Sequence, residues 1–587
     1  EFSTQAVHPG YIEPFASTAQ WQRDGHVTIW TTTQGTFDVR EGTALIMGIS
    51  ESLLKVIAME CGGGFGGKGP NTNPLNPMSA ILSKKSGLPV KMVMSRKETF
   101  ESTCPAAATR IWIKMGADKD GKITAAHMSL AYQSGAFPGS PVAAGIQNGL
   151  ATYKVENIEI DGYDVITNTQ KMQSYRAPGQ PPATFAVEGV VDELAEKLGI
   201  DPMEFRLNNA VQEGDPIPIT GAIGEGEAIE DSAIEPQIVT SCALTDCINE
   251  GAQEIQWSRK KDVTWKTNKD RPYLRRGLGI AVCMHGTAIP GLDMGAASIK
   301  INDDGSFNVL VGATDLGTGS DTVLGQIAAE TLGVPLEDIL VYSSDTDFTP
   351  FDTGAYASST TFISGGAVHK AAIDVREQIF NRASLMLDTT TINGMKIQDR
   401  YVYATNGSSV SLSEIALHSL HTQNQQQIMA TASHMSPYSP PPFAVQYAEV
   451  EVDTETGQVT VIKLVMAVDC GTAINPITAE GQIEGGMVQA LGYAISEEMP
   501  YDEKGNSLVT RFGDYRIYQA DEMPELVSIL VPSYEPNGPY GAKAVAEIPM
   551  NGVAPAVANA IYDAIGVRIR ELPLTPERIW NALRNKS

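Results

Sequence analysis

Several kinds of sequence feature are scarce or missing in this chain of 587 residues, and each absence excludes a class of protein. The six cysteines form no Cys-x-x-Cys pair, which predicts free thiols in a reducing compartment, the cytoplasm, rather than a disulfide framework. No apolar run approaches the roughly 20 residues that span a bilayer. The net charge of −27 argues against nucleic acid or an anionic membrane as partner, because both need a basic surface.

Metal-ligand spacings are also missing. The eight histidines and six cysteines contain neither His-x-x-x-His nor Cys-x-x-Cys, so the sequence predicts no zinc, haem or iron–sulfur cluster held by this chain. There is no Gly-x-Ser-x-Gly turn, and an esterase therefore has no support. We expect no metal to be bound directly by protein side chains.

What is present indicates a large α+β enzyme with mixed sheets and helices. The length exceeds what one core fills, and 55 Gly and 34 Pro suit a loop-rich globular chain. Residues 213–235 are rich in Gly, Pro and acids, which is typical of a boundary. We predict a first domain at 1–222, a linker at 223–235 and a second domain at 236–587. The start, Glu1-Phe without Met, leads us to expect a piece of a longer polypeptide.

Periodicity locates individual elements. Residues 183–198 have one broad apolar face and predict a helix, and a shorter helix is expected from Pro77 to Lys85. Residues 107–134 predict a hairpin. In the second half, residues 299–309 and 450–461 each place an acidic Gly turn between alternating strands, which predicts two related α+β subdomains.

The glycine cluster Gly62-Gly-Gly-Phe-Gly-Gly-Lys68 is the strongest local indication of a ligand-binding loop. Glycines let a backbone approach a ligand closely and direct N–H groups at it. A phosphate-binding P-loop is the rival interpretation, and Gly62, Gly67 and Lys68 fit it. Position 69 is Gly, however, so the hydroxyl that would bind magnesium is missing. A P-loop-like nucleotide-binding protein is thus a weak alternative.

Two further segments contain candidate charged groups. Arg176, in Tyr175-Arg-Ala-Pro-Gly-Gln180, precedes the helix at 183–198, where side-chain donors and free helix N–H groups can meet an anion. Glu547 ends Gly541-Ala-Lys-Ala-Val-Ala-Glu547 among small apolar residues. A carboxylate with so few polar neighbours in sequence can have a raised pKa and act as a general base.

The three segments above belong to a set of five that occur in the order found in one family. The other two are Asp352-Thr-Gly-Ala-Tyr-Ala-Ser358 and Gly481-Gln-Ile-Glu-Gly-Gly-Met-Val-Gln489. Together they resemble the molybdopterin-binding large subunit of the molybdenum hydroxylases, the xanthine dehydrogenase/aldehyde oxidoreductase family. The resemblance covers essentially all of the chain and implies two large molybdopterin-binding domains. It also implies about 150 residues of a small α/β domain ahead of residue 1.

The resemblance assigns roles to individual residues. Glu547 is the implied catalytic base, and Gln34 the implied partner of an oxygen ligand on the metal. The family's Gly-Gln-Gly segment is Gly317-Thr318-Gly319 here, so the usual Gln is absent, and a Thr hydroxyl can still donate to a pterin or phosphate oxygen. Gln482 and Gln489, two helical turns apart, can face one ligand. The implied cofactor-binding residues are Gln34, Gly64, Phe65, Gly66, Arg176, Gly317, Thr318, Gly319, Ala357, Ser358, Gln482 and Gln489.

The resemblance also implies the chemistry. A molybdenum–molybdopterin cytosine dinucleotide cofactor, held through its dithiolene sulfurs, would place a water-derived oxygen on an electrophilic carbon. Electrons would leave to [2Fe–2S] and FAD subunits, so we expect a hetero-oligomer, with dimerisation left open. The resemblance therefore implies a molybdenum-dependent oxidoreductase in which the protein binds and orients the reactants and removes a proton.

Departures from the family narrow the substrate. A Glu that xanthine-oxidising members carry after the loop lysine is Gly69 here, and the aromatic that sandwiches their purine is Pro178. The purine-holding Arg falls in Ser102-Thr-Cys-Pro-Ala106. The Cys of carbon monoxide dehydrogenases is Gln173. Xanthine and carbon monoxide are therefore disfavoured. An aldehyde, another N-heteroaromatic, or an aromatic acyl-CoA reduced as by 4-hydroxybenzoyl-CoA reductase remain, as does an inert scaffold.

Overall fold

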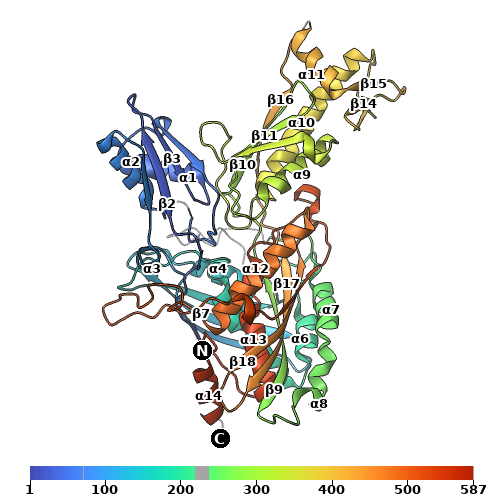
Figure 1. Ribbon diagram of the computed structural model, residues 1–587. Coiled ribbons are helices and arrows are strands. Elements are labelled where there is room, and N and C mark those ends of the chain that lie inside the picture. Colours follow the sequence, from blue (N-terminus) through green and yellow to red (C-terminus); the bar gives the residue numbers. More distant parts are fainter. Residues whose placement is uncertain (70–71, 218–236, 423, 586–587) are drawn as a thin grey trace.

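The structure is a computed structural model that describes residues 1–69, 72–217, 237–422 and 424–585 (Figure 1). In these ranges the chain folds into four mixed four-stranded sheets, one small three-stranded sheet, and helices that cover the sheet faces. The predicted α+β fold is confirmed. The predicted linker at 223–235 lies outside the described residues.

The first sheet has the strand order β1-β6-β7-β8, and the predicted hairpin at 107–134 forms its centre. Helix α5 begins at Gln180, three residues before the predicted start, because prolines occupy its first turn. The elements are β1 (Phe2–Thr4), β6 (Thr109–Ala117), β7 (Ile123–Gly135), β8 (Asn157–Ile166), α4 (Val142–Asn148), α5 (Gln180–Leu198) and α6 (Pro202–Asn209).

The second sheet has the order β4-β3-β2-β5 and packs against helices α1 and α2. Helix α2 contains the predicted helix at Pro77–Lys85 and ends at Gly87, which adopts the left-handed conformation with φ 68°. The elements are β2 (Ala16–Trp21), β3 (Val27–Thr31), β4 (Leu54–Ala58), β5 (Val90–Val93), α1 (Thr36–Met47), α2 (Leu75–Ser86) and α3 (Arg96–Ser102).

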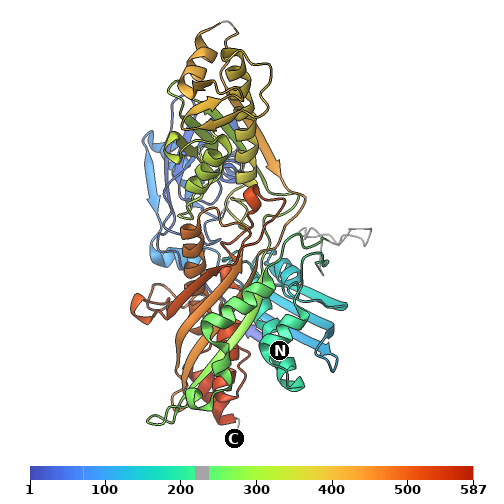
Figure 2. The ribbon, with the colours of Figure 1, turned by 90° about the vertical axis from the view of Figure 1, so that its right-hand side faces the viewer.

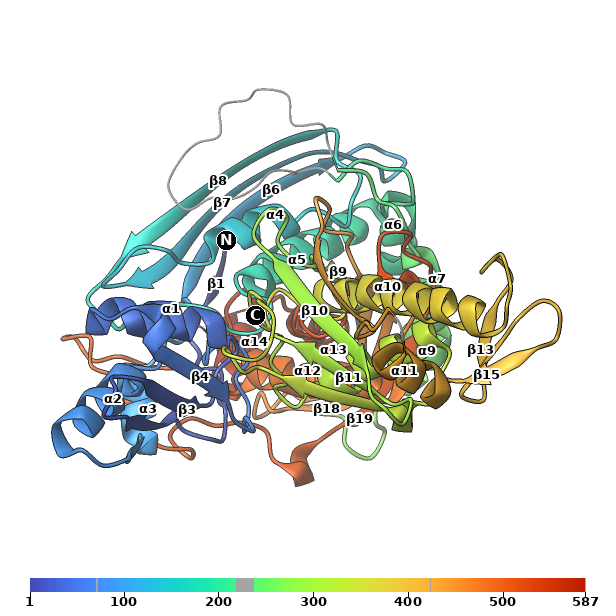
Figure 3. The ribbon, with the colours of Figure 1, turned by 90° about the horizontal axis from the view of Figure 1, so that it is seen from above.

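The third sheet, β12-β11-β10-β16, carries helices α9 and α10 and forms the upper right part of Figure 1. Seen from above, the small sheet β13-β14-β15 projects at the end of the molecule beyond α10 (Figure 3). The elements are β10 (Met294–Ile301), β11 (Phe307–Val311), β12 (Ile339–Ser343), β13 (Lys396–Gln398), β14 (Tyr401–Tyr403), β15 (Ser409–Ser411), β16 (Met429–Met435), α9 (Ser320–Leu332), α10 (Ile363–Met386) and α11 (Leu412–His421).

The fourth sheet, β19-β18-β17-β9, packs against α7, α12 and α13 in the lower body of the molecule (Figure 2). The elements are β9 (Leu274–Met284), β17 (Phe443–Asp453), β18 (Val459–Asp469), β19 (Glu525–Leu530), α7 (Leu244–Ile255), α8 (Val263–Lys266), α12 (Pro476–Ile495), α13 (Val553–Ile565) and α14 (Pro576–Asn585). Within the described ranges, none of the helices combines the length and apolar character needed for a bilayer span.

All four large sheets share one arrangement of strands, in which the fourth strand comes first in the chain in two sheets (β1, β9) and last in the other two (β5, β16). Each contains an antiparallel hairpin, a helical crossover from its second strand to a parallel third strand, and a fourth strand antiparallel to the first. The hairpins predicted at 299–309 and 450–461 are confirmed as β10–β11 and β17–β18. With the hairpin predicted at 107–134, which is β6–β7, the sequence signals located three of the four copies of this unit.

The hydrophobic cores join the two halves of the chain. The largest core includes Phe185 from the first half and Tyr447 from the second, both almost fully buried. Separate cores fill the third sheet with α9 and α10, and the second sheet with α1 and α2. The N-terminal strand also bridges to the C-terminal segment at Ser3 and Glu571 (Figure 1). Residues on both sides of the predicted linker therefore share one core. The limits of the two domains, 1–222 and 236–587, stay a prediction.

Candidate active site

The predicted site residues converge on one cavity of about 2050 Å³ at the meeting point of the sheets. Every one of the thirteen predicted residues except Gly319 lines it. Gly319 instead precedes α9, where a Cβ would stand 3.0 Å from the side chain of Thr478. The residues that line the cavity are Gln34, Gly64, Phe65, Gly66, Arg176, Gly317, Thr318, Ala357, Ser358, Gln482, Gln489 and Glu547.

The glycine loop at 62–67 requires its glycines. Phe65 has φ 54° and Gly66 has φ 91°, both in the left-handed region. A Cβ on Gly66 would stand 2.7 Å from the carbonyl oxygen of Ser174, and one on Gly64 would stand 2.9 Å from Oε1 of Gln34. The backbone of the loop is therefore pressed against the segments that line the cavity, where no side chain fits.

Gln34 connects this loop to a second one. Its Oε1 accepts a hydrogen bond from the backbone N–H of Gly66 at 2.9 Å, and its Nε2 donates to the carbonyl of Ala355 at 3.0 Å. Gln34 is almost fully buried, and one amide hydrogen remains after the bond to Ala355. The side chain positions both loops and still faces the cavity.

The lysine of the glycine loop points away from the cavity. Lys68 is fully buried and its Nζ donates to the carboxylate of Glu13, with the ring of Tyr11 5.3 Å away. Glu13 also accepts the N–H of Gly62 at 2.8 Å. A P-loop lysine has to reach the phosphates of its ligand, so this geometry counts against the nucleotide-binding alternative.

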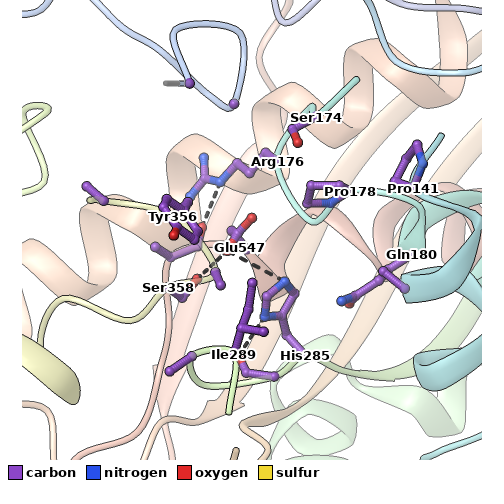
Figure 4. Close-up of a pocket in the computed structure, with 18 of the residues that line it drawn as sticks. Pro141, Ser174, Arg176, Pro178, Gln180, His285, Ile289, Tyr356, Ser358 and Glu547 are labelled. Carbon is purple, nitrogen blue, oxygen red and sulfur yellow. Dashed lines mark hydrogen bonds and ion pairs between the residues drawn. The ribbon is translucent and has the colours of Figure 1, made fainter. Parts of the chain in front are cut away.

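Glu547 lies in a polar pocket that its sequence neighbours do not reveal. Its Oε1 accepts the backbone N–H of Ala177 at 3.0 Å, and its Oε2 accepts the hydroxyl of Ser358 at 2.8 Å (Figure 4). The side chain keeps 15% of its surface exposed to the cavity. The expectation of few polar neighbours holds in sequence only, because the partners come from residues 189 and 370 positions away.

Arg176 holds the backbone beside Glu547. Its Nε donates to the carbonyl of Ala546 at 2.7 Å, its Nη1 to Oε1 of Gln489 at 2.8 Å, and its Nη2 to the carbonyl of Gln482 at 2.7 Å. Burial lowers the pKa of Arg176 to about 10, against the opposing charge of Glu547. Gln482 and Gln489 were predicted to face one ligand, and here the backbone carbonyl of Gln482 and Oε1 of Gln489 both accept from this guanidinium.

The segment at 317–319 offers fewer free donors than expected. The carboxylate of Asp315 accepts the N–H of Gly317 at 2.8 Å and that of Gly319 at 3.3 Å. These donors at the start of α9 are therefore already bonded within the chain. Gly317 and Thr318 still line the cavity, and Thr318 keeps its hydroxyl there.

The loop at 352–359 is held in a strained conformation next to buried acids. Ala357 and Ser358 have φ values of 50° and 53°, in the left-handed region. Burial raises the pKa of Asp352 to about 7 and that of Asp293 to about 6. The hydroxyl of Tyr356, which lines the cavity, lies near Asp293, and its own pKa is raised by burial.

Among the polar residues of the cavity that sequence reasoning missed are His285 and Gln180. His285 follows directly after β9 and places Nε2 3.6 Å from Oε2 of Glu547, with 6% of its side chain exposed. Gln180 is almost fully buried at the start of α5, where its Oε1 accepts from Nδ2 of Asn551 at 2.8 Å. A polar residue next to a glycine at the end of a buried strand, as in His285-Gly286, is the signal that was available.

The assignment of Gln180 is fixed by its neighbours. Nδ2 of Asn551 also donates to the carbonyl of Met284 at 2.9 Å, and a carbonyl only accepts. Since Nδ2 is thus the donor toward Gln180, Oε1 of Gln180 is the acceptor. Its Nε2 is then turned to the cavity, in the direction seen in Figure 4.

The chain matches known proteins in sequence over most of its length. Two stretches match models described as Molybdopterin cofactor-binding domain, residues 1–210 and 250–524. The chain is 35% identical to "Probable hypoxanthine oxidase XdhD" of Escherichia coli K12 over 95% of its length, and 33% identical to "Putative xanthine dehydrogenase molybdenum-binding subunit XdhA" of the same strain over 99%. The chain belongs to the xanthine dehydrogenase/aldehyde oxidoreductase family of molybdenum-binding subunits.

A solved structure with this fold is quinoline 2-oxidoreductase from Pseudomonas putida 86, with a TM-score of 0.90 and 27% identity. The match covers 99% of this chain and 75% of that one. The chain spans 57% of the length of XdhD and 76% of that of XdhA. Both the sequence and the fold thus agree with the family membership.

The cavity fits the family's cofactor. Its 2050 Å³ exceeds the roughly 300–1000 Å³ of an ordinary small-molecule site, which leaves room for a molybdopterin cofactor and a substrate together. The glycine loop presents backbone, not side chain, to the cavity. Across the described ranges, no group of three or more His, Cys, Asp or Glu could hold a metal ion.

Proposed function

We propose that this chain binds molybdenum as molybdopterin cytosine dinucleotide and hydroxylates an N-heteroaromatic compound or an aldehyde at an electrophilic carbon. The observation that supports this most is the position of Glu547. Its carboxylate faces the cavity while an N–H and an O–H hold its two oxygens. A base needs this combination of access and fixed orientation. The bound cofactor would supply the oxygen atom and accept two electrons.

The chain's own residues would divide the remaining work. Glu547 would accept the proton that the reaction releases. Arg176 would hold the carbonyl of Ala546 and so the position of the base, and Gln34 would direct its remaining amide hydrogen at an oxygen near the metal. Phe65 and its flanking glycines would line the metal end of the cofactor. Gly317 and Thr318 would contact the pterin dinucleotide.

The lining of the cavity favours a neutral substrate. Among the residues described there, Arg176 is the single Lys or Arg, and its guanidinium is bonded to the protein. Asp38, Asp164 and Glu547 add negative charge. A substrate with an anionic reacting end is therefore disfavoured. The phosphates of an acyl-CoA, like those of the pterin dinucleotide, can be bound by backbone N–H groups, so the aromatic acyl-CoA reductase alternative is left to the test.

Two proline rings form an apolar surface across the cavity from the base, and such a surface suits a planar substrate ring. Pro141 and Pro178 lie beside one another on one side of the cavity, opposite Glu547 and Tyr356 (Figure 4). The names of the three relatives described above refer to hypoxanthine, xanthine and quinoline, which are all N-heteroaromatic. An oxopurine therefore joins the candidates, although Pro178 stands where xanthine-oxidising members carry an aromatic ring. We place an N-heteroaromatic ahead of an aldehyde.

Electrons would pass to separate [2Fe–2S] and FAD subunits in a hetero-oligomer, as the family resemblance implies. The six cysteines are free in the structure, which supports a reducing, cytoplasmic setting. The test is turnover by the cofactor-loaded protein, with an artificial electron acceptor, of hypoxanthine, quinoline, benzaldehyde and an aromatic acyl-CoA. Turnover of a heteroaromatic supports the proposal. Activity restricted to the acyl-CoA would overturn it.

A further inference from the structure

The ring of His285 has one nitrogen whose role is fixed. Nδ1 lies 2.6 Å from the carbonyl oxygen of Gly286. A carbonyl accepts and never donates, so Nδ1 carries the hydrogen. In the neutral imidazole, Nε2 then has a lone pair and no hydrogen. That lone pair is the part of the ring that faces Glu547 (Figure 4).

Two acceptors therefore face each other across the cavity wall. Nε2 of His285 and Oε2 of Glu547 are 3.6 Å apart, slightly more than the roughly 2.6–3.2 Å of a hydrogen bond. With neutral His285 and ionised Glu547, no hydrogen lies between them. One proton added to either atom turns the contact into a hydrogen bond. The pair is thus arranged to take up a single proton and to share it.

We propose that His285 accepts the proton that Glu547 removes in each turnover, and passes it to water in the cavity. This rests on the proposed function of Glu547 as the base. In the step, the O–H bond at Oε2 of Glu547 breaks and an N–H bond forms at Nε2 of His285. The carboxylic acid returns to carboxylate and the neutral imidazole becomes imidazolium. No electrons change hands, and the base is ready again.

The surroundings of the pair support such a transfer. His285 is mostly buried yet lines the cavity, so its ring reaches the cavity water. The charged groups around Glu547 are Arg176, from the segment before α5, and Asp293, from the loop after His285. Tyr356 faces Asp293 from the loop before α10. Arg176 stabilises the carboxylate of Glu547 and so favours release of the proton to His285, whereas Asp293, a like charge, opposes ionisation of Glu547.

The first test needs no cofactor and no turnover. The imidazole signals of the purified chain are followed by NMR across pH, with His285→Gln identifying the signal of His285. We expect the pH response of this signal to change in Glu547→Gln, because the group that faces Nε2 is no longer a carboxylate. His369→Gln is the matched control, since this histidine bonds Thr331 on α9 away from the cavity. An unchanged titration in Glu547→Gln would overturn the proposal.

The second test uses the loaded enzyme. His285→Ala should lower kcat about 100-fold with KM retained, because the base regenerates slowly. Added imidazole should restore part of the rate, whereas it should not change the wild type or His369→Gln. A structural role of His285 would produce no rescue, and that outcome would overturn the proposal. If the wild type itself lacks molybdenum and activity, the proposed function fails, while the NMR result still decides the coupling of His285 to Glu547.

Discussion

The guanidinium of Arg176 donates through Nε to the carbonyl oxygen of Ala546 at 2.7 Å, and so fixes the backbone one residue before the proposed base. The two residues are 370 positions apart in sequence. Gln489 and Gln482, both on α12, accept from the other guanidinium nitrogens. Arg176, from the segment before α5, thus ties the base to helix α12.

The first prediction concerns this anchor. Arg176→Lys keeps the charge and loses the planar fork, so it cannot hold the carbonyl of Ala546 and both glutamines at once. A displacement of the base by about 1 Å lowers kcat/KM about 100-fold. Steady-state kinetics with molybdenum content measured in parallel would check this. Arg376→Lys, which loses a fork that reaches Thr331 on α9, should keep full activity. Equal activity of Arg176→Lys and the wild type would contradict the anchoring role.

The second prediction concerns the glycine loop. In Gly66→Ala the new Cβ would stand 2.7 Å from the carbonyl of Ser174, at φ 91°. Backbone strain of this kind costs about 1–3 kcal/mol, and the clash adds to it. Gly87→Ala is the matched control, because Gly87 also has a positive φ and no atom within 4 Å of its Cβ position. Thermal unfolding should show the larger loss for Gly66→Ala. Equal losses would show that the loop is not tightly packed.

The third prediction concerns pH and Asp352. Burial raises its pKa from 3.8 to about 7, so the folded protein keeps a proton that the unfolded chain releases between these values. The contribution of this carboxyl to stability is therefore complete below about pH 4 and is lost as pH rises towards 7. Each pKa unit corresponds to about 1.4 kcal/mol.

Asp352→Asn removes this titration and keeps the shape. Denaturant unfolding at pH 5 and pH 8 should show that the variant gains stability relative to the wild type as pH rises. The amide can still accept from the N–H of Gly354 and donate to Ser364, both present partners of the carboxyl. A difference between the two proteins that does not change with pH would mean that the buried carboxyl stays ionised.

How far the sequence predicts this site depends on the kind of signal. The glycines at 62–67 predict a loop whose backbone approaches a ligand closely, and this loop does line the cavity. Glu547, Arg176 and Ser358 were found because their segments match a family pattern. His285 was not, because a lone histidine has no spacing to mark it, and only the fold brings it to Glu547. Gly319 was predicted to line the cavity and does not. Its N–H donates to the carboxylate of Asp315, and the side chain of Thr478 lies against it.

The fold shows a similar division. The hairpins at 299–309 and 450–461 have local turn chemistry, so their strands and register follow from sequence. The hairpin β6–β7 was likewise predicted, at 107–134, whereas β2–β3 builds the same unit with a weaker turn signal. The shared core of Phe185 and Tyr447 depends on contacts between distant segments, which no local pattern contains.

The fourth prediction separates an enzyme from an inert scaffold. Glu547→Gln should lower turnover by about 10² to 10⁴-fold, because an amide accepts no proton from the reaction. Its oxygen can still accept from Ala177 or Ser358, so cofactor content should stay at the wild-type level. Kinetics and molybdenum analysis of the same preparations would check both parts. Unchanged turnover in the variant would exclude Glu547 as the base.

The most direct test of the account is the molybdenum and pterin content of the chain, purified after co-expression with the genes that neighbour its own. We predict about one molybdenum atom per chain together with a pterin dinucleotide that releases a cytosine nucleotide on hydrolysis. A folded chain that contains neither metal nor pterin under these conditions would contradict the claim that the cavity at the glycine loop is a molybdenum cofactor site.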